Sequence, residues 1–99
     1  MPSEKISIAN LSWLNESTNF LLQVSKKSER LTRFIKEDIP DKDKNWLLDL
    51  KSWEIKKKWV EDVAQLCSEE FDQAFIDVGE EYFDLTDPKD FKRFEDTVK

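Results

Sequence analysis

Glycine occurs only once in this sequence of 99 residues, at position 79, and histidine does not occur at all. Loops that cradle phosphate groups in nucleotide-binding proteins need several glycines, so the chain can form neither a Walker A loop nor a dinucleotide-binding fingerprint. Tight hairpin turns of the Asn-Gly type are absent as well. The scarcity of glycine therefore excludes most nucleotide-dependent enzymes, and it favours helix where a pattern is ambiguous.

The clearest periodic pattern lies between residues 57 and 78. Apolar side chains recur there at intervals of three and four, whereas acidic side chains fall largely on the other faces. The apolar positions are Val60, Val63, Cys67, Phe71, Ala74 and Val78. The pattern predicts a long amphipathic helix over 57–78, and Gly79 is expected to end it because glycine readily adopts the left-handed C-cap conformation.

Two short patterns near the start predict an antiparallel hairpin. Residues 5–11 alternate polar and apolar, residues 20–24 form an apolar run, and the polar cluster at 15–19 is typical of a turn. A helix should follow, because Ser28 can cap its first turn and Pro40 disfavours helical backbone in the residue before it. Its apolar face would consist of Leu31, Phe34 and Ile35.

Residues 46–56 allow two predictions. Trp46, Leu50 and Trp53 lie at i, i+4 and i+7, a spacing that suits a helix. The Trp-x-Ile alternation and the strand propensity of these residues suit a second hairpin that turns at 50–52. We favour the hairpin over the helix.

The remaining segments are shorter. Residues 41–45 are charged or polar and predict a solvated loop, and residues 82–83 lie in a linker or a strand. Asp87 and Pro88 suit the N-cap and first position of a C-terminal helix. The apolar edge of that helix would consist of Phe91, Phe94 and Val98.

Together these elements predict an α+β fold: a small antiparallel sheet of two hairpins, with a long amphipathic helix and a short C-terminal helix packed on one face. An all-α bundle is the alternative. The length and the aromatic content of 12% predict a single small folded domain over residues 1–99.

Charge is distributed unevenly along the chain, whose formal net charge is −6. Residues 1–58 carry 12 basic and 9 acidic side chains, a net charge of +3, whereas residues 59–99 carry 4 and 13, a net charge of −9. A basic half and an acidic half are typical of a binding surface, although surface charge also serves solubility alone.

The residue types needed for most catalytic and metal sites are missing. Without histidine there is no Ser-His-Asp or Cys-His pair, and Cys67 alone forms no internal disulfide. Carboxylates are abundant, but none follows the spacing of an EF-hand loop. We therefore expect no catalytic residue, no metal and no cofactor, and we expect Cys67 to be a small buried apolar side chain.

Two surfaces are candidate binding sites. A basic and aromatic patch consists of Lys51, Trp53, Lys56, Lys57, Lys58 and Trp59. Such a mixture binds single-stranded nucleic acid through phosphate contacts and base stacking, unless the tryptophans anchor the core and the lysines are merely solvated. An acidic face consists of Glu61, Asp62, Glu69, Glu70, Asp77, Glu80 and Glu81. It is either a solvated surface or an imitation of a phosphate backbone.

Part of the basic stretch resembles the aromatic hairpin of HARP-type domains. The similarity lies within residues 31–66 and rests on Ile39-Pro40, Trp46, Lys51 and Trp53. Leu47 departs from the pattern, because an acidic residue usually follows the first aromatic. Domains of that family accompany annealing helicases and contact nucleic acid, so the resemblance implies nucleic-acid binding.

No run of about 18 apolar residues is present that would span a membrane, and the N-terminus lacks a signal-peptide pattern. We therefore expect a soluble cytoplasmic protein without membrane contact. The leading hypothesis is a small non-catalytic binding module that recognises a protein partner through its charge-polarised surface. The alternatives are single-stranded nucleic-acid binding through residues 51–59 and acidic mimicry that inhibits a nucleic-acid enzyme.

Overall fold

The structure of the protein is a computed structural model that describes residues 6–13 and 17–98. Its strands are β1 (Ile8–Ser12), β2 (Asn19–Val24), β3 (Lys44–Leu47), β4 (Ser52–Lys56), β5 (Gln73–Asp77) and β6 (Tyr82–Asp84). Its α-helices are α1 (Glu29–Glu37), α2 (Val60–Glu70) and α3 (Pro88–Val98). Two short 3₁₀ turns, η2 (Asp41–Asp43) and η3 (Lys57–Trp59), precede β3 and α2.

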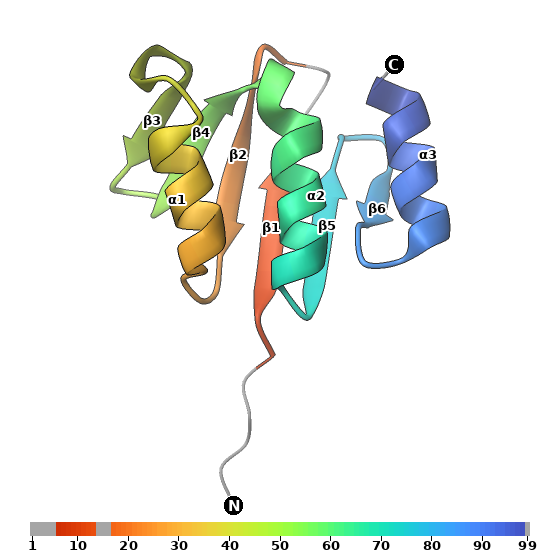
Figure 1. Ribbon diagram of the computed structural model, residues 1–99. Helices are drawn as coiled ribbons and strands as arrows, with labels where there is room; N and C mark the ends of the chain where they lie inside the picture. Colours follow the sequence, from red (N-terminus) through yellow and green to blue (C-terminus); the bar gives the residue numbers. More distant parts are fainter. Residues whose placement is uncertain (1–5, 14–16, 99) are drawn as a thin grey trace, which may run out of the picture.

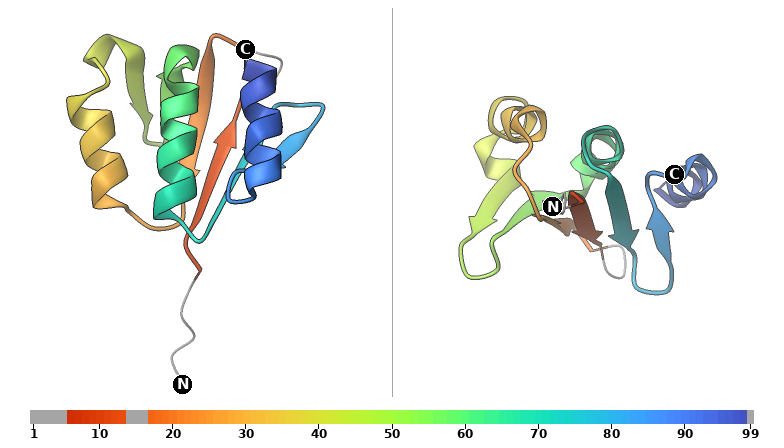
Figure 2. Two further views of the ribbon diagram at one scale, coloured as in Figure 1. Left: turned by 45° about the vertical axis from the view of Figure 1, so that its right-hand side comes forward. Right: turned by 90° about the horizontal axis from the view of Figure 1, so that it is seen from below.

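The strands form one mixed sheet in the order β3-β4-β2-β1-β5-β6. Among the described strands only the neighbouring pair β1 and β5 is parallel, and the other neighbours are antiparallel. All three helices lie on the same face of this sheet (Figure 1), and the view from below in Figure 2 shows the other face without a helix in the described part of the chain. The predicted α+β class is therefore confirmed, and the all-α alternative is not favoured. The prediction of a purely antiparallel sheet of two hairpins is wrong, because β5 and β6 extend the sheet and β5 pairs in parallel with β1.

Both predicted hairpins are present. β1 pairs with β2, and β3 pairs with β4 so that Trp46 lies opposite Trp53. The turn of the second hairpin covers residues 48–51, and Lys51 adopts a positive φ of 49° there. The turn predicted at 15–19 lies partly outside the described residues, and Asn19 already belongs to β2.

The helix predicted over 57–78 is wrong beyond Glu70. η3 replaces its first turn, α2 is 11 residues long, and the chain then returns as strand β5. The helical spacing of the apolar residues after Phe71 misleads because Ala74 and Ile76 also alternate, and both are buried where β5 lies between β1 and β6. Gly79, with φ of 100°, lies in the turn between β5 and β6 and does not cap a helix.

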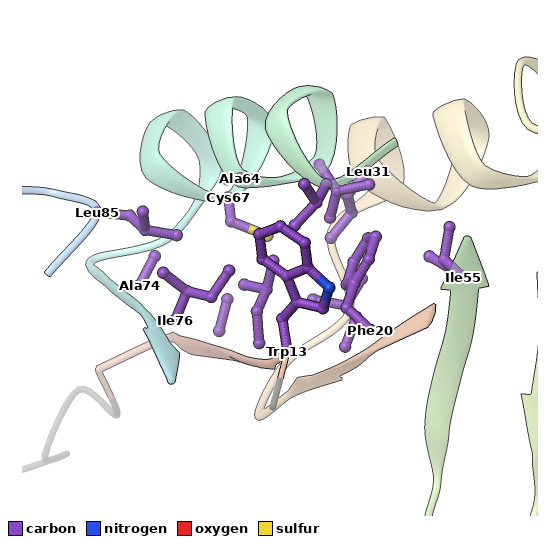
Figure 3. Close-up of a cluster of buried hydrophobic side chains, with 14 of the residues drawn as sticks. Trp13, Phe20, Leu31, Ile55, Ala64, Cys67, Ala74, Ile76 and Leu85 are labelled. Carbon is purple, nitrogen blue, oxygen red and sulfur yellow. The ribbon is translucent and has the colours of Figure 1, made fainter. Parts of the chain in front are cut away.

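The apolar core lies between the helices and the covered face of the sheet. In Figure 3, the ring of Trp13 from the sheet side lies close to Cys67 of α2, with Phe20 on its other side toward Ile55, and all four are buried. The predicted helix faces are confirmed as well. Leu31, Ile35 and Phe94 are buried, and Phe34, Phe91 and Val98 pack against the core at its margin.

The loop predicted at 41–45 is solvated only in part. Asp43 is 5% exposed, and the side chain of Lys44 is 8% exposed. The Nζ of Lys44 donates to the carbonyl oxygens of Ile35 at 2.6 Å and Lys36 at 3.1 Å, near the C-terminal end of α1. A cation is favourable at that end because the last carbonyls of a helix lack partners within it. The hydrogen bonds of Lys44 therefore link β3 to the C-terminal end of α1.

Candidate binding groove

The structure divides the predicted basic and aromatic patch between the two ends of β4. Lys51 and Trp53 lie at the turn of the β3–β4 hairpin, whereas Lys56 to Trp59 lie at the opposite end. A five-residue strand spans about 16 Å, so these two groups do not form one surface.

Lys58 and Trp59, at the opposite end of β4 from the turn, have contacts within the fold. Nε1 of Trp59 donates to Oδ2 of Asp43 over 3.1 Å, and the Trp59 ring packs edge-on against Phe34 with centroids 6.0 Å apart. Nζ of Lys58 lies 3.5 Å from the same carboxylate oxygen and 5.4 Å from the centroid of the Trp59 ring. Trp59 thus anchors the junction between η2 and η3, as a core tryptophan does.

Lys51 and Trp53, at the turn end of β4, belong to a groove that we call the hairpin groove. It lies between α1 and the strands β2, β4 and β3, with a volume of about 660 Å³. Its apolar lining consists of the accessible side chains of Val24, Trp46, Leu48 and Trp53 above the buried core residues Leu22, Leu31 and Ile35. Its cationic residues are Lys26, Lys27, Lys36 and Lys51.

The charge of the hairpin groove has a single sign. Four lysines contribute to it, and none of the described residues that line it carries a carboxylate. This local excess of positive charge contrasts with the net charge of −6 of the whole chain. The groove therefore offers an electrostatic attraction to an anionic ligand that most of the molecule does not offer.

Large apolar side chains remain exposed beside the groove. Trp46 is 46% exposed, Leu48 is 74% exposed and Leu50 is 55% exposed, all within one hairpin. The Trp46 ring packs against Trp53, with centroids 5.2 Å apart in an edge-on arrangement. This contact holds Trp46 in place while much of its surface stays accessible, as expected of a binding residue rather than a core anchor.

A second cavity, of about 630 Å³, lies at the start of α1 and is lined by two of the protein's own carboxylates, Glu29 and Glu70. Ser28 Oγ donates to Glu70 at 3.1 Å and accepts from the backbone N–H of Leu31, which confirms Ser28 as the N-cap. Arg30 lies 3.2 Å from Glu70 and 3.1 Å from Glu69, and these carboxylates raise the pKa of its guanidinium. We therefore assign this cavity a structural role.

The predicted acidic residues do not form one face. Glu69 and Glu70 lie at the end of α2 and pair with Arg30, while Glu61 and Asp62 lie at its start. The others lie around the β5–β6 turn. Asp77 accepts from the N–H of Gly79 there, Glu80 is in the turn itself, and Glu81 pairs with Arg93.

Cys67 is buried, as predicted, and burial raises the pKa of its thiol to about 12. In residues 6–13 and 17–98, no three or more Cys, Asp or Glu side chains gather in a way that would hold a metal ion. None of the helices in the same ranges has the length and apolar character needed to cross a bilayer.

Comparison with family models, curated proteins and solved structures finds no match to this chain. The resemblance to HARP-type domains therefore rests on the quoted residues alone. Sequence reasoning missed Lys26, Lys27 and Lys36 as neighbours of Lys51 and Trp53. The adjacent pair Lys26-Lys27 was a visible signal, but only the pairing of β2 with β4 brings it to the groove.

Proposed function

We propose that this chain is a non-catalytic binding module that recognises an acidic segment of a partner protein in the hairpin groove. The observation that carries the proposal is the combination of exposed Trp46 and Leu48 with four lysines and no lining carboxylate. An apolar surface supplies affinity when it is buried, and the surrounding cations select the sign of the partner's charge.

A protein segment suits this groove better than a polynucleotide. The accessible lining of the groove includes the aliphatic side chains of Val24 and Leu48, which match apolar side chains of a peptide, whereas unspecific nucleic-acid sites rely on aromatic platforms along a basic channel. A polynucleotide extending past the groove would also meet the carboxylates that give the chain its net charge of −6. Single-stranded nucleic acid remains the second candidate, because Trp46 is half-exposed beside lysines.

The test uses three probes: a library of short peptides rich in glutamate and large apolar residues, a single-stranded oligonucleotide, and dodecanoate. Tryptophan fluorescence reports on binding, because Trp46 and Trp53 line the groove. We expect the peptides to bind, and their affinity to fall several-fold between about 50 and about 200 mM salt.

Charge variants localise the response. Lys36→Glu is expected to weaken peptide binding about five- to tenfold. Lys92→Glu makes the same charge change at an exposed site on α3 and is expected to leave binding nearly unchanged. Binding of the oligonucleotide or dodecanoate alone, equal effects of both variants, or no binding by any probe would each overturn the proposal.

A further inference from the structure

The outer edge of β3 is open for strand addition. β3 is the first strand of the sheet and has only β4 as a neighbour among the described strands. Backbone groups of an antiparallel strand point alternately to one neighbour and to the other side. The question is therefore which residues of β3 direct their N–H and C=O groups outward.

The register of β4 with its neighbours β2 and β3 determines these directions. The N–H of Lys57 donates to the carbonyl oxygen of Thr18, so Trp53 and Ile55 direct their backbone groups toward β2 and Glu54 directs its groups toward β3. Glu54 pairs with Asn45, and consequently Trp46 directs its N–H and C=O away from the sheet. The N–H of Lys44, two residues earlier, likewise bonds outside the ladder, to Asp41.

The same residue serves the groove and the edge. Trp46 lines the hairpin groove with its side chain, while its backbone offers a donor and an acceptor to an added strand. Every second side chain of such a strand would lie on the groove side. Lys36 lies near the start of β3, because its carbonyl accepts from Lys44, and Lys51 lies in the turn beyond its end.

We propose that the partner segment binds in extended form as a seventh strand on β3. Its groove-side residues are acidic, apolar and acidic in turn, so that the apolar side chain contacts Trp46 and the two carboxylates reach the lysines at either end of the groove. These two carboxylates are four residues apart, about 13 Å in an extended chain. This inference rests on the proposed function and specifies the conformation of its ligand.

The opposite edge of the sheet supports the choice of β3. β6 has three residues, of which Asp84 is acidic, whereas β3 contains Lys44 and no carboxylate. An acidic segment is repelled there and attracted at β3. The two edges thus differ in charge.

The test is a matched pair of variants, Trp46→Ala and Trp46→Pro. Both remove the indole, but only proline removes the N–H, and proline is tolerated on an edge strand whose N–H faces outward. The probe is a pool of blocked peptides that carry glutamate, serine, a large apolar residue, serine and glutamate in that order. We expect Trp46→Pro to bind the pool at least about fivefold more weakly than Trp46→Ala, as loss of a backbone hydrogen bond predicts. Binding is followed by the chemical shifts of the groove residues in both variants, because both lack the Trp46 ring.

A second measurement covers the case in which Trp46→Pro fails to fold. The pool is methylated on alternate backbone nitrogens in two frames and offered to the unchanged protein. Methylation of the amides that face β3 should abolish binding. Methylation of the alternate amides, which face away from β3, should leave binding unchanged. If the pool binds but both frames bind equally, strand addition is wrong and the proposed function stands; if no acidic peptide binds, both are wrong.

Discussion

Nε1 of Trp59 donates to Oδ2 of Asp43 over 3.1 Å and so joins the two 3₁₀ turns that flank the β3–β4 hairpin. The hydrogen bond favours the ionised carboxylate, and the nearby Lys58 ammonium adds to this effect. Together they hold the pKa of Asp43 below its ordinary value of 3.8. The junction is therefore stabilised by a charge that persists at neutral pH.

The first prediction concerns acid stability. Because the pKa of Asp43 is lowered in the folded chain, its contribution to stability is full above the ordinary value of 3.8 and is lost as the pH falls through the lower value. Trp59→Phe removes the main donor and should reduce this acid-dependent loss while leaving Lys58 in place. A carboxyl NMR titration checks it, and an Asp43 that titrates at its ordinary value in the unchanged protein contradicts it.

A second prediction concerns Lys44, whose nearly buried ammonium binds two carbonyls at the end of α1. Lys44→Met keeps most of the side-chain volume but leaves those carbonyls without this donor. We expect a loss of about 1–3 kcal/mol in the free energy of unfolding. Urea unfolding measures it, with Lys42→Met as the exposed control on the same segment; equal losses in both variants would show that Lys44 has no capping role.

A substitution at Lys51 separates the effect of the groove's charge on binding from the effect of the hairpin turn on folding stability. Its positive φ of 49° suits asparagine at least as well as lysine, so Lys51→Asn should fold with equal or higher stability. It also removes one groove cation, and binding of the acidic peptides should weaken about two- to fivefold. Thermal unfolding and titration together check this. Weaker binding accompanied by a lower Tm would instead indicate damage to the hairpin.

A further prediction concerns the thiol of Cys67. Its pKa of about 12 and its burial leave almost no thiolate at neutral pH, so a disulfide reagent should not react with the folded protein. The reaction should appear in denaturant at the rate of an ordinary thiol. Rapid reaction under native conditions would show that α2 opens readily from the sheet.

The elements with local signals were predictable. Ser28 as an N-cap, the helix before Pro40 and the start of α3 at Pro88 depend on neighbouring residues, and the structure has each of them. The burial of the apolar positions on these helices followed from spacing alone.

The errors concern segments that long-range packing decides. Ala74 and Ile76 fit a helix as well as a strand locally, and only pairing with Ala9 and Leu11, far away in the sequence, selects the strand. The same holds for the groove, since Lys26 comes to it through the pairing of β2 with β4 and Lys36 through the position of α1 over the hairpin. A sequence pattern predicts which face of a helix or strand is apolar, but it does not predict which helices and strands become neighbours.

The parallel pair of interior strands, β1 and β5, sets an order of events during synthesis. The contacts of Ser7 with Asp72 beside this pair span 65 residues, so β1 lacks its second neighbour until β5 has left the ribosome. The two hairpins can form earlier, because their strands are close in sequence. Until then the emerging chain exposes the inner edge of β1, the kind of edge that recruits foreign strands. Chains interrupted before β5 should therefore aggregate, and completing the sheet closes that vulnerable edge.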